Sequence, residues 1–344
     1  MIVSVRISQK PETIKAGIMT KPAEDAQHSR KQRPVTFDPK LELFQDNLQL
    51  VTLTFGIVLY TDALFSENAN AINACYDRFL SLCPESELRF YATENMRRHK
   101  PVTKRALAML PTWLKPGAPP REYFAIELKN GQAYQDAPTF SFKVCGGEPG
   151  STLRQSGQPN MVKMAFPAQW GSERSGDMLK LVQDLCSFFP FKSGLAGFSF
   201  ECSRYASEAS QSHAWAASMR HPGIDIPRIP EDGRALGQDG LKGVGWLTIL
   251  GNYFVNLLGG VESIRRGLSN DIEILEVSHG VILRAGAAPA LGDVNRADRL
   301  PLYREIYRLL ASWIGLASER TLAFNLAENY VERTERWFKR LADE

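Results

Sequence analysis

Several features that would mark a particular class of protein are missing from this chain of 344 residues. Its five cysteines include no Cys-x-x-Cys pair, and an odd number cannot all pair as disulfides, which favours a reducing compartment. No apolar run reaches the roughly 20 residues of a membrane-spanning helix, and the N-terminus lacks a signal-peptide pattern. We therefore expect a soluble cytoplasmic protein that does not bind membranes.

An excess of one charge is also missing from most of the chain. The formal net charge is +3, and residues 1–40 alone carry eight Lys and Arg against four Asp and Glu, so the remainder is nearly neutral. This balance predicts neither a basic surface for direct nucleic-acid binding nor an acidic mimic of DNA. We interpret residues 1–40 as a mobile basic arm.

The residue patterns of common enzymes are scarce too. The nearest match to Gly-x-Ser-x-Gly starts at Gly197 and fails at Glu201, and none of the five histidines forms a His-x-x-x-His pair. The sequence therefore predicts no cofactor, no metal site and no enzyme.

The apolar pattern that is present alternates between helix and strand periods, which is typical of an α+β fold. The order strand, helix, strand, helix, strand, strand occurs twice, so we predict two duplicated halves, each a sheet with helices packed on one face, followed by C-terminal helices. A stretch rich in Gly, Pro and Ser at residues 145–158 divides them. The predicted units are residues 1–40, 41–150 and 151–344. The predicted strands are 48–60, 88–92, 123–128, 139–144, 161–166, 195–200, 272–277 and 281–285.

Residues 246–258 form the longest apolar segment, and its polar residues Thr248, Asn252 and Asn256 recur every four positions. That spacing predicts a buried helix with one polar row, which either forms hydrogen bonds in the core or faces a partner. Gly259 and Gly260 are expected to end it, because glycine adopts the left-handed conformation without a steric penalty.

Five stretches of the chain resemble a known family when taken in order. They read Pro-Phe-Lys-Ser-Gly-Leu-Ala-Gly-Phe-Ser-Phe-Glu at 190–201, His-Pro-Gly-Ile-Asp at 221–225, Gly-Val-Gly-Trp-Leu-Thr-Ile-Leu-Gly at 243–251, Leu-Gly-Gly at 258–260, and Val-Ile-Leu-Arg-Ala-Gly-Ala-Ala-Pro-Ala-Leu-Gly-Asp-Val-Asn-Arg at 281–296. Together they resemble the type VI secretion immunity family of bacteria, and the resemblance covers most of the chain after residue 40.

The resemblance implies a role in binding and neutralising one cognate secreted toxin, often a nuclease that acts in the cytoplasm. It also implies that the matching glycine, proline and aromatic positions specify the fold rather than contact the toxin. These positions are His221, Pro222, Gly223, Trp246, Gly286, Gly292 and Asp293.

Asp293 is the sharpest single candidate for chemistry, because Gly286 and Gly292 bracket a loop that ends at its carboxylate. It could bind a metal or act as a base together with His221, which would make the protein an uncharacterised enzyme. It could equally accept hydrogen bonds from the backbone near Asn295, which we favour. A structural partner of the secretion apparatus is the other alternative.

A toxin inhibitor needs a complementary surface, and nucleases generally present basic clefts to their substrate. The richest local supply of acidic side chains in a predicted loop is Asp225, Glu231, Asp232 and Asp239, diluted by Arg228 and Arg234. We predict that this loop contacts the toxin. The alternative is that it is a solvated connector.

Overall fold

The structure is a computed structural model that describes residues 37–119, 121–148, 150–151, 159–227, 236, 240–315 and 329–342. The predicted basic arm lies outside the described residues, apart from residues 37–40. Among residues 37–40, the Asp38 carboxylate accepts a hydrogen bond from the Lys40 N–H at the start of a short 3-10 helix, Pro39–Leu41.

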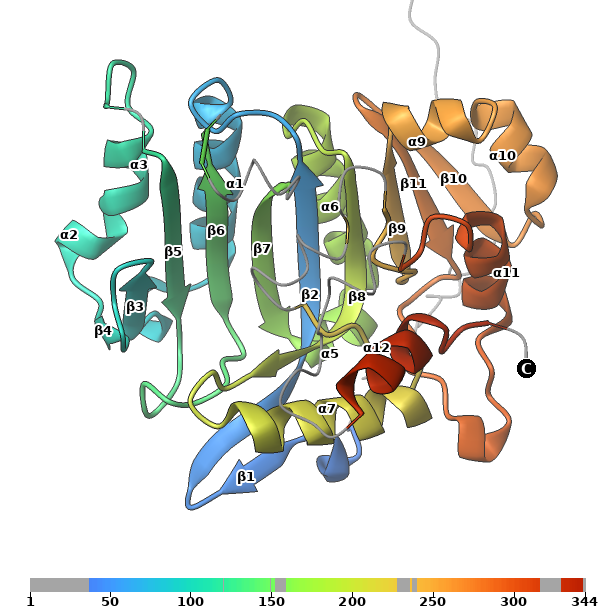
Figure 1. Ribbon diagram of the computed structural model, residues 1–344, viewed down its shortest axis with the longest axis horizontal. Helices are drawn as coiled ribbons and strands as arrows, with labels where there is room; N and C mark the ends of the chain where they lie inside the picture. The colour runs from blue at the N-terminus through green and yellow to red at the C-terminus, as the bar shows by residue number, and fades with distance from the viewer. Residues whose placement is uncertain are drawn as a thin grey trace, which may run out of the picture. The chain divides into compact units, whose positions relative to one another are not determined.

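Eleven strands of the described residues form one sheet, in which every paired strand is antiparallel to its neighbour (Figure 1). The order is β10-β11-β9-β8-β2-β7-β6-β5-β3-β4, and β1 pairs with β2. The strands are β1 Leu43–Gln45, β2 Leu48–Thr61, β3 Phe90–Thr93, β4 Lys100–Pro101, β5 Tyr123–Lys129, β6 Ser141–Gly147, β7 Asn160–Pro167, β8 Ser193–Cys202, β9 Leu247–Gly251, β10 Ile272–Val277 and β11 Gly280–Ala285.

Helices pack around this sheet, and within the described residues they occupy five of the ten connections between consecutive strands. They are α1 Ala69–Leu82, α2 Lys104–Leu107, α3 Met109–Trp113, α5 Ala168–Glu173, α6 Ser175–Phe188, α7 Ser207–Arg220, α9 Asn252–Leu257, α10 Val261–Gly267, α11 Pro301–Leu310 and α12 Tyr330–Phe338. The α+β class predicted from the sequence is confirmed.

The prediction that each half forms its own sheet is wrong, because β2 joins the two. This strand is buried along nearly its whole length and pairs with β8 on one edge and β7 on the other. A strand that is apolar on both faces requires cover on both faces of its sheet. The halves also lack the common strand order that a duplication requires. The central strands β2 and β7 are flanked by β6, the last strand of the first half, on one side and by β8, the second strand of the second half, on the other. A boundary at residues 145–158 stays a prediction.

Helices cover both faces of the sheet rather than the one face expected (Figure 1). On one face, the Phe79 ring of α1 packs against the rings of Phe142 and Phe166, and α6 lies beside α1. Lys143 follows Phe142 in β6, so its side chain points to the opposite face. There it lines a recess together with Gln211 of α7, which places α7 on this second face.

The helix predicted over residues 246–258 is wrong in its first half. Residues 247–251 form strand β9 between β8 and β11, and all five are buried. A short apolar run is equally compatible with a buried helix and a strand buried on both faces, and the flanking strands decide here. The polar row therefore does not exist: Thr248 is buried in the sheet, whereas Asn252 and Asn256 are exposed on α9. Gly259 and Gly260 do follow the helix, with φ of 83° and 89°.

Candidate functional site

The family-motif residues meet where the chain leaves α7 and where the loop after β11 returns. His221 Nδ1 lies 2.5 Å from the Gly292 carbonyl oxygen, so this nitrogen carries the proton and donates. The Gly223 N–H donates to the Leu291 carbonyl at 2.9 Å. The two loops approach so closely that a Cβ on Gly223 would lie 2.1 Å from the Ala290 carbonyl oxygen. Glycine at this position therefore permits the contact between the loops.

Asp293 holds the same loop by its carboxylate. Arg220 donates to both oxygens, Nε to Oδ1 at 3.1 Å and Nη2 to Oδ2 at 2.8 Å. Oδ1 also accepts the Asn295 N–H at 3.0 Å, which caps the 3-10 helix Val294–Arg296. The hydrogen bonds from Arg220 hold the pKa of Asp293 at about 2, although partial burial alone would raise it. The structure thus shows the capping contact and brings His221 and Asp293 into one loop cluster.

Replacing Asp293 by Asn tests whether this carboxylate is structural. The pKa of Asp293 is lowered by folding, so its contribution to stability is present above its unfolded pKa, near 4, and is lost as the pH falls from about 4 toward 2. We expect Asp293→Asn to lower the melting temperature by a few degrees at pH 7 and to leave toxin binding intact. The difference from wild type should shrink when both are melted near pH 3. Unchanged melting with lost binding would instead make Asp293 a contact residue.

Trp246 joins the cluster from the start of β9. Its side chain is fully buried, and its indole N–H donates to the Gly286 carbonyl at 3.0 Å. Gly286 and Gly292 have φ of 86° and 68°, a region that favours glycine, and both therefore suit the turns of this loop. Apart from the ion pair of Asp293 with the Arg220 side chain, these contacts join motif residues to backbone of the protein itself. They are what a fold-specifying role would require, and that role stays a prediction.

Asp225, proposed above as a toxin contact, is buried and already engaged. Its Oδ2 accepts a hydrogen bond from Lys242 Nζ at 2.9 Å, and the side chains are 11% and 2% exposed. The buried Arg340 lies close enough to feel the Asp225 charge and donates to the carbonyls of Pro222 and Ile224. Asp225 thus presents no free carboxylate at the surface. Glu231, Asp232 and Asp239 lie outside the described residues, and the contact proposed for them stays a prediction.

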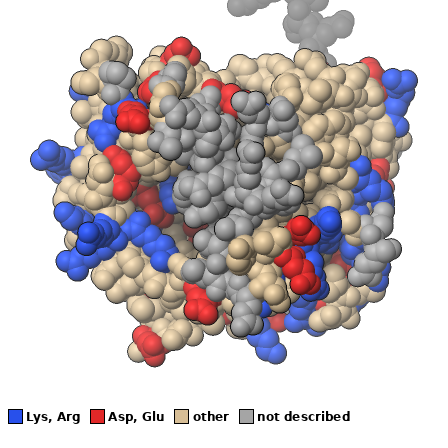
Figure 2. Space-filling view, in the orientation of Figure 1, with Lys and Arg blue, Asp and Glu red and all other residues tan. Residues whose placement is uncertain are grey.

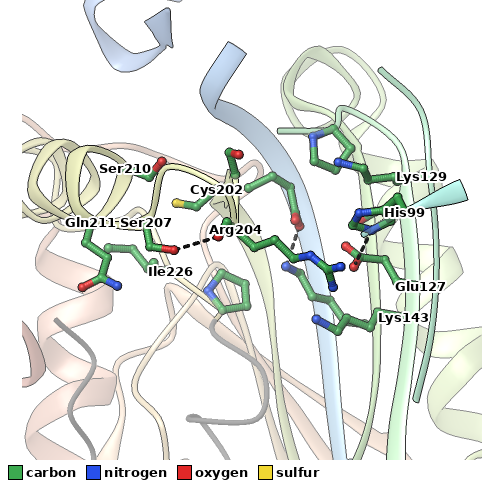
Figure 3. Close-up of a pocket in the computed structure, with 16 residues that line it drawn as sticks. His99, Glu127, Lys129, Lys143, Cys202, Arg204, Ser207, Ser210, Gln211 and Ile226 are labelled. Atoms are coloured by element: carbon green, nitrogen blue, oxygen red, sulfur yellow. Dashed lines mark hydrogen bonds and ion pairs between the residues drawn. The ribbon is translucent and has the colours of Figure 1, made fainter. Parts of the chain in front are cut away.

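A second group of polar side chains lies on the sheet itself, in a recess of about 220 Å³ (Figure 3). Glu127, Lys143 and Lys163 are direct neighbours across β5, β6 and β7, so their side chains form one row on the same face. We call this recess the sheet pocket. It is lined by His99, Glu127, Lys129, Pro138, Ser141, Lys143, Lys163, Glu201, Cys202, Ser203, Arg204, Ser207, Ser210, Gln211, Ile226 and Pro227.

Charged and polar side chains in the sheet pocket form two close pairs. Lys163 Nζ lies 2.6 Å from Glu201 Oε1, and His99 Nε2 lies 3.0 Å from Glu127 Oε2. Burial lowers the pKa of His99, so the ring is neutral at pH 7 and donates from Nε2 to Glu127. Burial would raise the pKa of Glu127, but the Lys143 charge and the His99 hydrogen bond outweigh it and hold that pKa well below its usual range.

Sequence reasoning missed the sheet pocket, although a signal was present. Each of β5, β6, β7 and β8 carries a Lys or Glu in a run of otherwise apolar or small residues. A charged side chain inside a buried strand requires a partner, so such residues are candidates for a shared polar site. Recognising that they face each other needs the register of four strands, which the sequence does not provide.

The described residues contain no ready-made metal centre. Across these ranges, no group of three or more His, Cys, Asp or Glu side chains is arranged to hold a metal ion. None of the helices in the described part of the chain is both long and apolar enough to cross a membrane.

Comparison with known proteins defines the class. The model of the family TsiV, described as type VI immunity for VRR-NUC, matches residues 71–341. A solved structure, the Pseudomonas aeruginosa T6SS protein PA0821, is similar to this chain with a TM-score of 0.72 and 20% sequence identity, over 88% of each chain. At this identity the likeness shows a shared fold. No curated protein sequence matches the chain.

The chain therefore falls in the class of type VI secretion immunity proteins. Because the family model spans most of its length, including all five motif stretches, it belongs to the TsiV family of type VI immunity proteins for VRR-NUC.

Proposed function

We propose that this protein binds a nuclease toxin of the VRR-NUC kind one to one and blocks it in the cytoplasm before it reaches the DNA of the producing cell. The match of residues 71–341 to the immunity family carries this proposal, and the name of the family specifies the nuclease. The protein then acts by occupying the toxin and performs no reaction of its own. The buried contacts of His221 and Asp293 support this role, since both side chains are engaged in holding loops together.

Protection of cells tests the proposal. A VRR-NUC nuclease encoded beside the gene of this protein should reduce colony counts by several orders of magnitude when expressed alone. Co-expression of this chain should restore growth, and the two proteins should purify as one complex. Growth that is not restored, with both proteins present and folded, would refute the proposed function.

The acidic loop makes a separate prediction about where the toxin binds. A double variant, Glu231→Lys with Asp232→Lys, reverses two adjacent charges in this loop. If the loop meets a basic cleft, association with the toxin should slow by about tenfold at low salt, because electrostatic attraction mainly sets the association rate. The matched control reverses two exposed acids elsewhere, Glu85→Lys and Glu87→Lys. Equal rates for both double variants would make the loop a connector.

A further inference from the structure

Exposed basic side chains gather at the end of the sheet that carries β3, β4 and α2 (Figure 2). Arg97 and Arg98 are exposed just before β4, Lys100 is exposed at its start, and Arg204 is exposed where β8 leads into α7. Arg204 Nη2 donates to the carbonyls of Met96 and Arg97, which ties the two segments together. We call Arg97, Arg98, Lys100 and Arg204 the basic rim.

The basic rim is continuous with the sheet pocket. His99, which lies between Arg98 and Lys100, lines the pocket, and so does Arg204 itself. Figure 3 shows the Arg204 side chain extending across the recess toward the strands that carry Glu127 and Lys143. Rim and pocket thus form one surface whose positive charge borders a hollow.

This surface retains positive charge that the described residues do not neutralise. Within the described ranges, Arg97, Arg98 and Lys100 form no ion pair, and Lys143 has Glu127 as an electrostatic neighbour but no hydrogen bond. The pocket lining contains three lysines and one arginine against the carboxylates of Glu127 and Glu201. A half-buried ammonium group without a hydrogen-bond acceptor favours an incoming anionic oxygen.

The size of the pocket decides which kind of anion it suits. Whole small-molecule ligands usually occupy about 300–1,000 Å³, whereas this recess is about 220 Å³. A single carboxylate side chain fits such a volume. The phosphates of a nucleic acid are less suitable, because Glu127 and Glu201 would repel a polyanion that covers the recess.

We propose that the basic rim and the sheet pocket are a toxin-docking surface that accepts an acidic segment of the toxin, with one carboxylate meeting Lys143. This inference rests on the proposed function. It places part of the contact on acidic residues of the toxin that lie away from the basic cleft where its DNA binds, since the rim would be repelled by that cleft.

The test compares toxin binding by wild type and by three variants, with association and dissociation rates measured at two salt concentrations. Arg97→Glu with Arg98→Glu should slow association at least tenfold at low salt, and less at high salt, because screening weakens the field. Lys143→Gln should raise the dissociation rate at least fivefold. The matched control is the exposed pair Arg265→Glu with Arg266→Glu on α10, which should change either rate less than twofold.

Each outcome is decisive. Suppose that the wild-type protein binds the toxin but the rim variant, the Lys143 variant or both bind it at the wild-type rates. This result overturns the joint docking surface and leaves the proposed function standing. No binding by wild type refutes the proposed function itself.

A labelled DNA duplex is the remaining probe. If wild type binds the duplex and the rim variant does not, while toxin binding is unchanged, the surface serves nucleic acid and the proposal is wrong. Lys143→Met, which keeps the packing volume, replaces Lys143→Gln if that variant unfolds.

Discussion

Replacing Asp225 by Ala is expected to lower the free energy of unfolding by about 3–5 kcal/mol, the usual result of removing one partner of a buried ion pair. Lys242 is 2% exposed at its side chain, so its ammonium group would lose its carboxylate without gaining access to water. Arg340 would lose the same neighbouring charge. Denaturant unfolding measures the change, with the slope against denaturant concentration checked for constancy.

The control for Asp225 replaces both partners. The double variant Asp225→Leu with Lys242→Met removes both charges of the pair. No unpaired charge is then left in the interior, so part of the lost stability should return. If Asp225→Ala unfolds like wild type but binds the toxin far more weakly, the structural role assigned to Asp225 is wrong, and the acidic residue predicted from the sequence as a toxin contact is one after all.

The second large effect is expected for Gly223→Val. Even a single Cβ would lie 2.1 Å from the Ala290 carbonyl and 3.0 Å from the Leu291 carbonyl, and both obstacles are backbone atoms that cannot rotate away. The two loops must then separate, which breaks the hydrogen bond from the Gly223 N–H to Leu291 and strains the neighbouring one from His221. We expect the free energy of unfolding to fall by more than about 3 kcal/mol, which is the upper end for an overpacked site, or the protein not to fold at all.

Gly176→Ala is the matched control for Gly223. Gly176 lies in the first turn of α6, and a Cβ there meets nothing within 4 Å. Alanine is a better helix former than glycine, so this variant should be as stable as wild type or more so. Equal stability of Gly223→Val and Gly176→Ala would show that the loops do not meet as described.

The sequence predicts most elements because their apolar periods are long and unambiguous. The continuous apolar run of β2 indicates a strand buried on both faces, and this is what it forms at the centre of the sheet. Ile72, Cys75, Tyr76 and Phe79 recur at helical spacing, which likewise predicts one buried helix face, and all four are buried in α1. Local pattern is sufficient in these cases, since one segment determines its own conformation.

Pairing between distant segments is what the sequence does not reveal. The apolar residues of β9 are compatible with a helix or a strand when read alone, and the neighbours β8 and β11 make this segment a strand. The sheet pocket depends on the same information, since Glu127, Lys143 and Lys163 become neighbours only through the register of three strands. Their charges, isolated in buried strands, are visible in the sequence, but their partners are not.

The motif residues illustrate a third situation, in which the sequence indicates importance but not the reason. Gly223 is required by a close approach of two loops, and Asp293 by its hydrogen bonds to Arg220 and Asn295. Apart from the local hydrogen bond from Asn295, these contacts join segments that lie far apart along the chain. The resemblance to an immunity family identified these positions, and the structure supplies the contacts that explain them.

Titration of nuclease activity tests the central claim, stoichiometric inhibition of a toxin, most directly. An inhibitor that must leave few free toxin molecules needs a dissociation constant of about 1 nM or lower. The nuclease is held at a concentration well above this dissociation constant. Cleavage of a DNA substrate is then followed as this protein is added. One-to-one inhibition predicts a linear fall to zero activity that ends at one molecule of inhibitor per nuclease. Activity that remains at several-fold excess of folded inhibitor would contradict it.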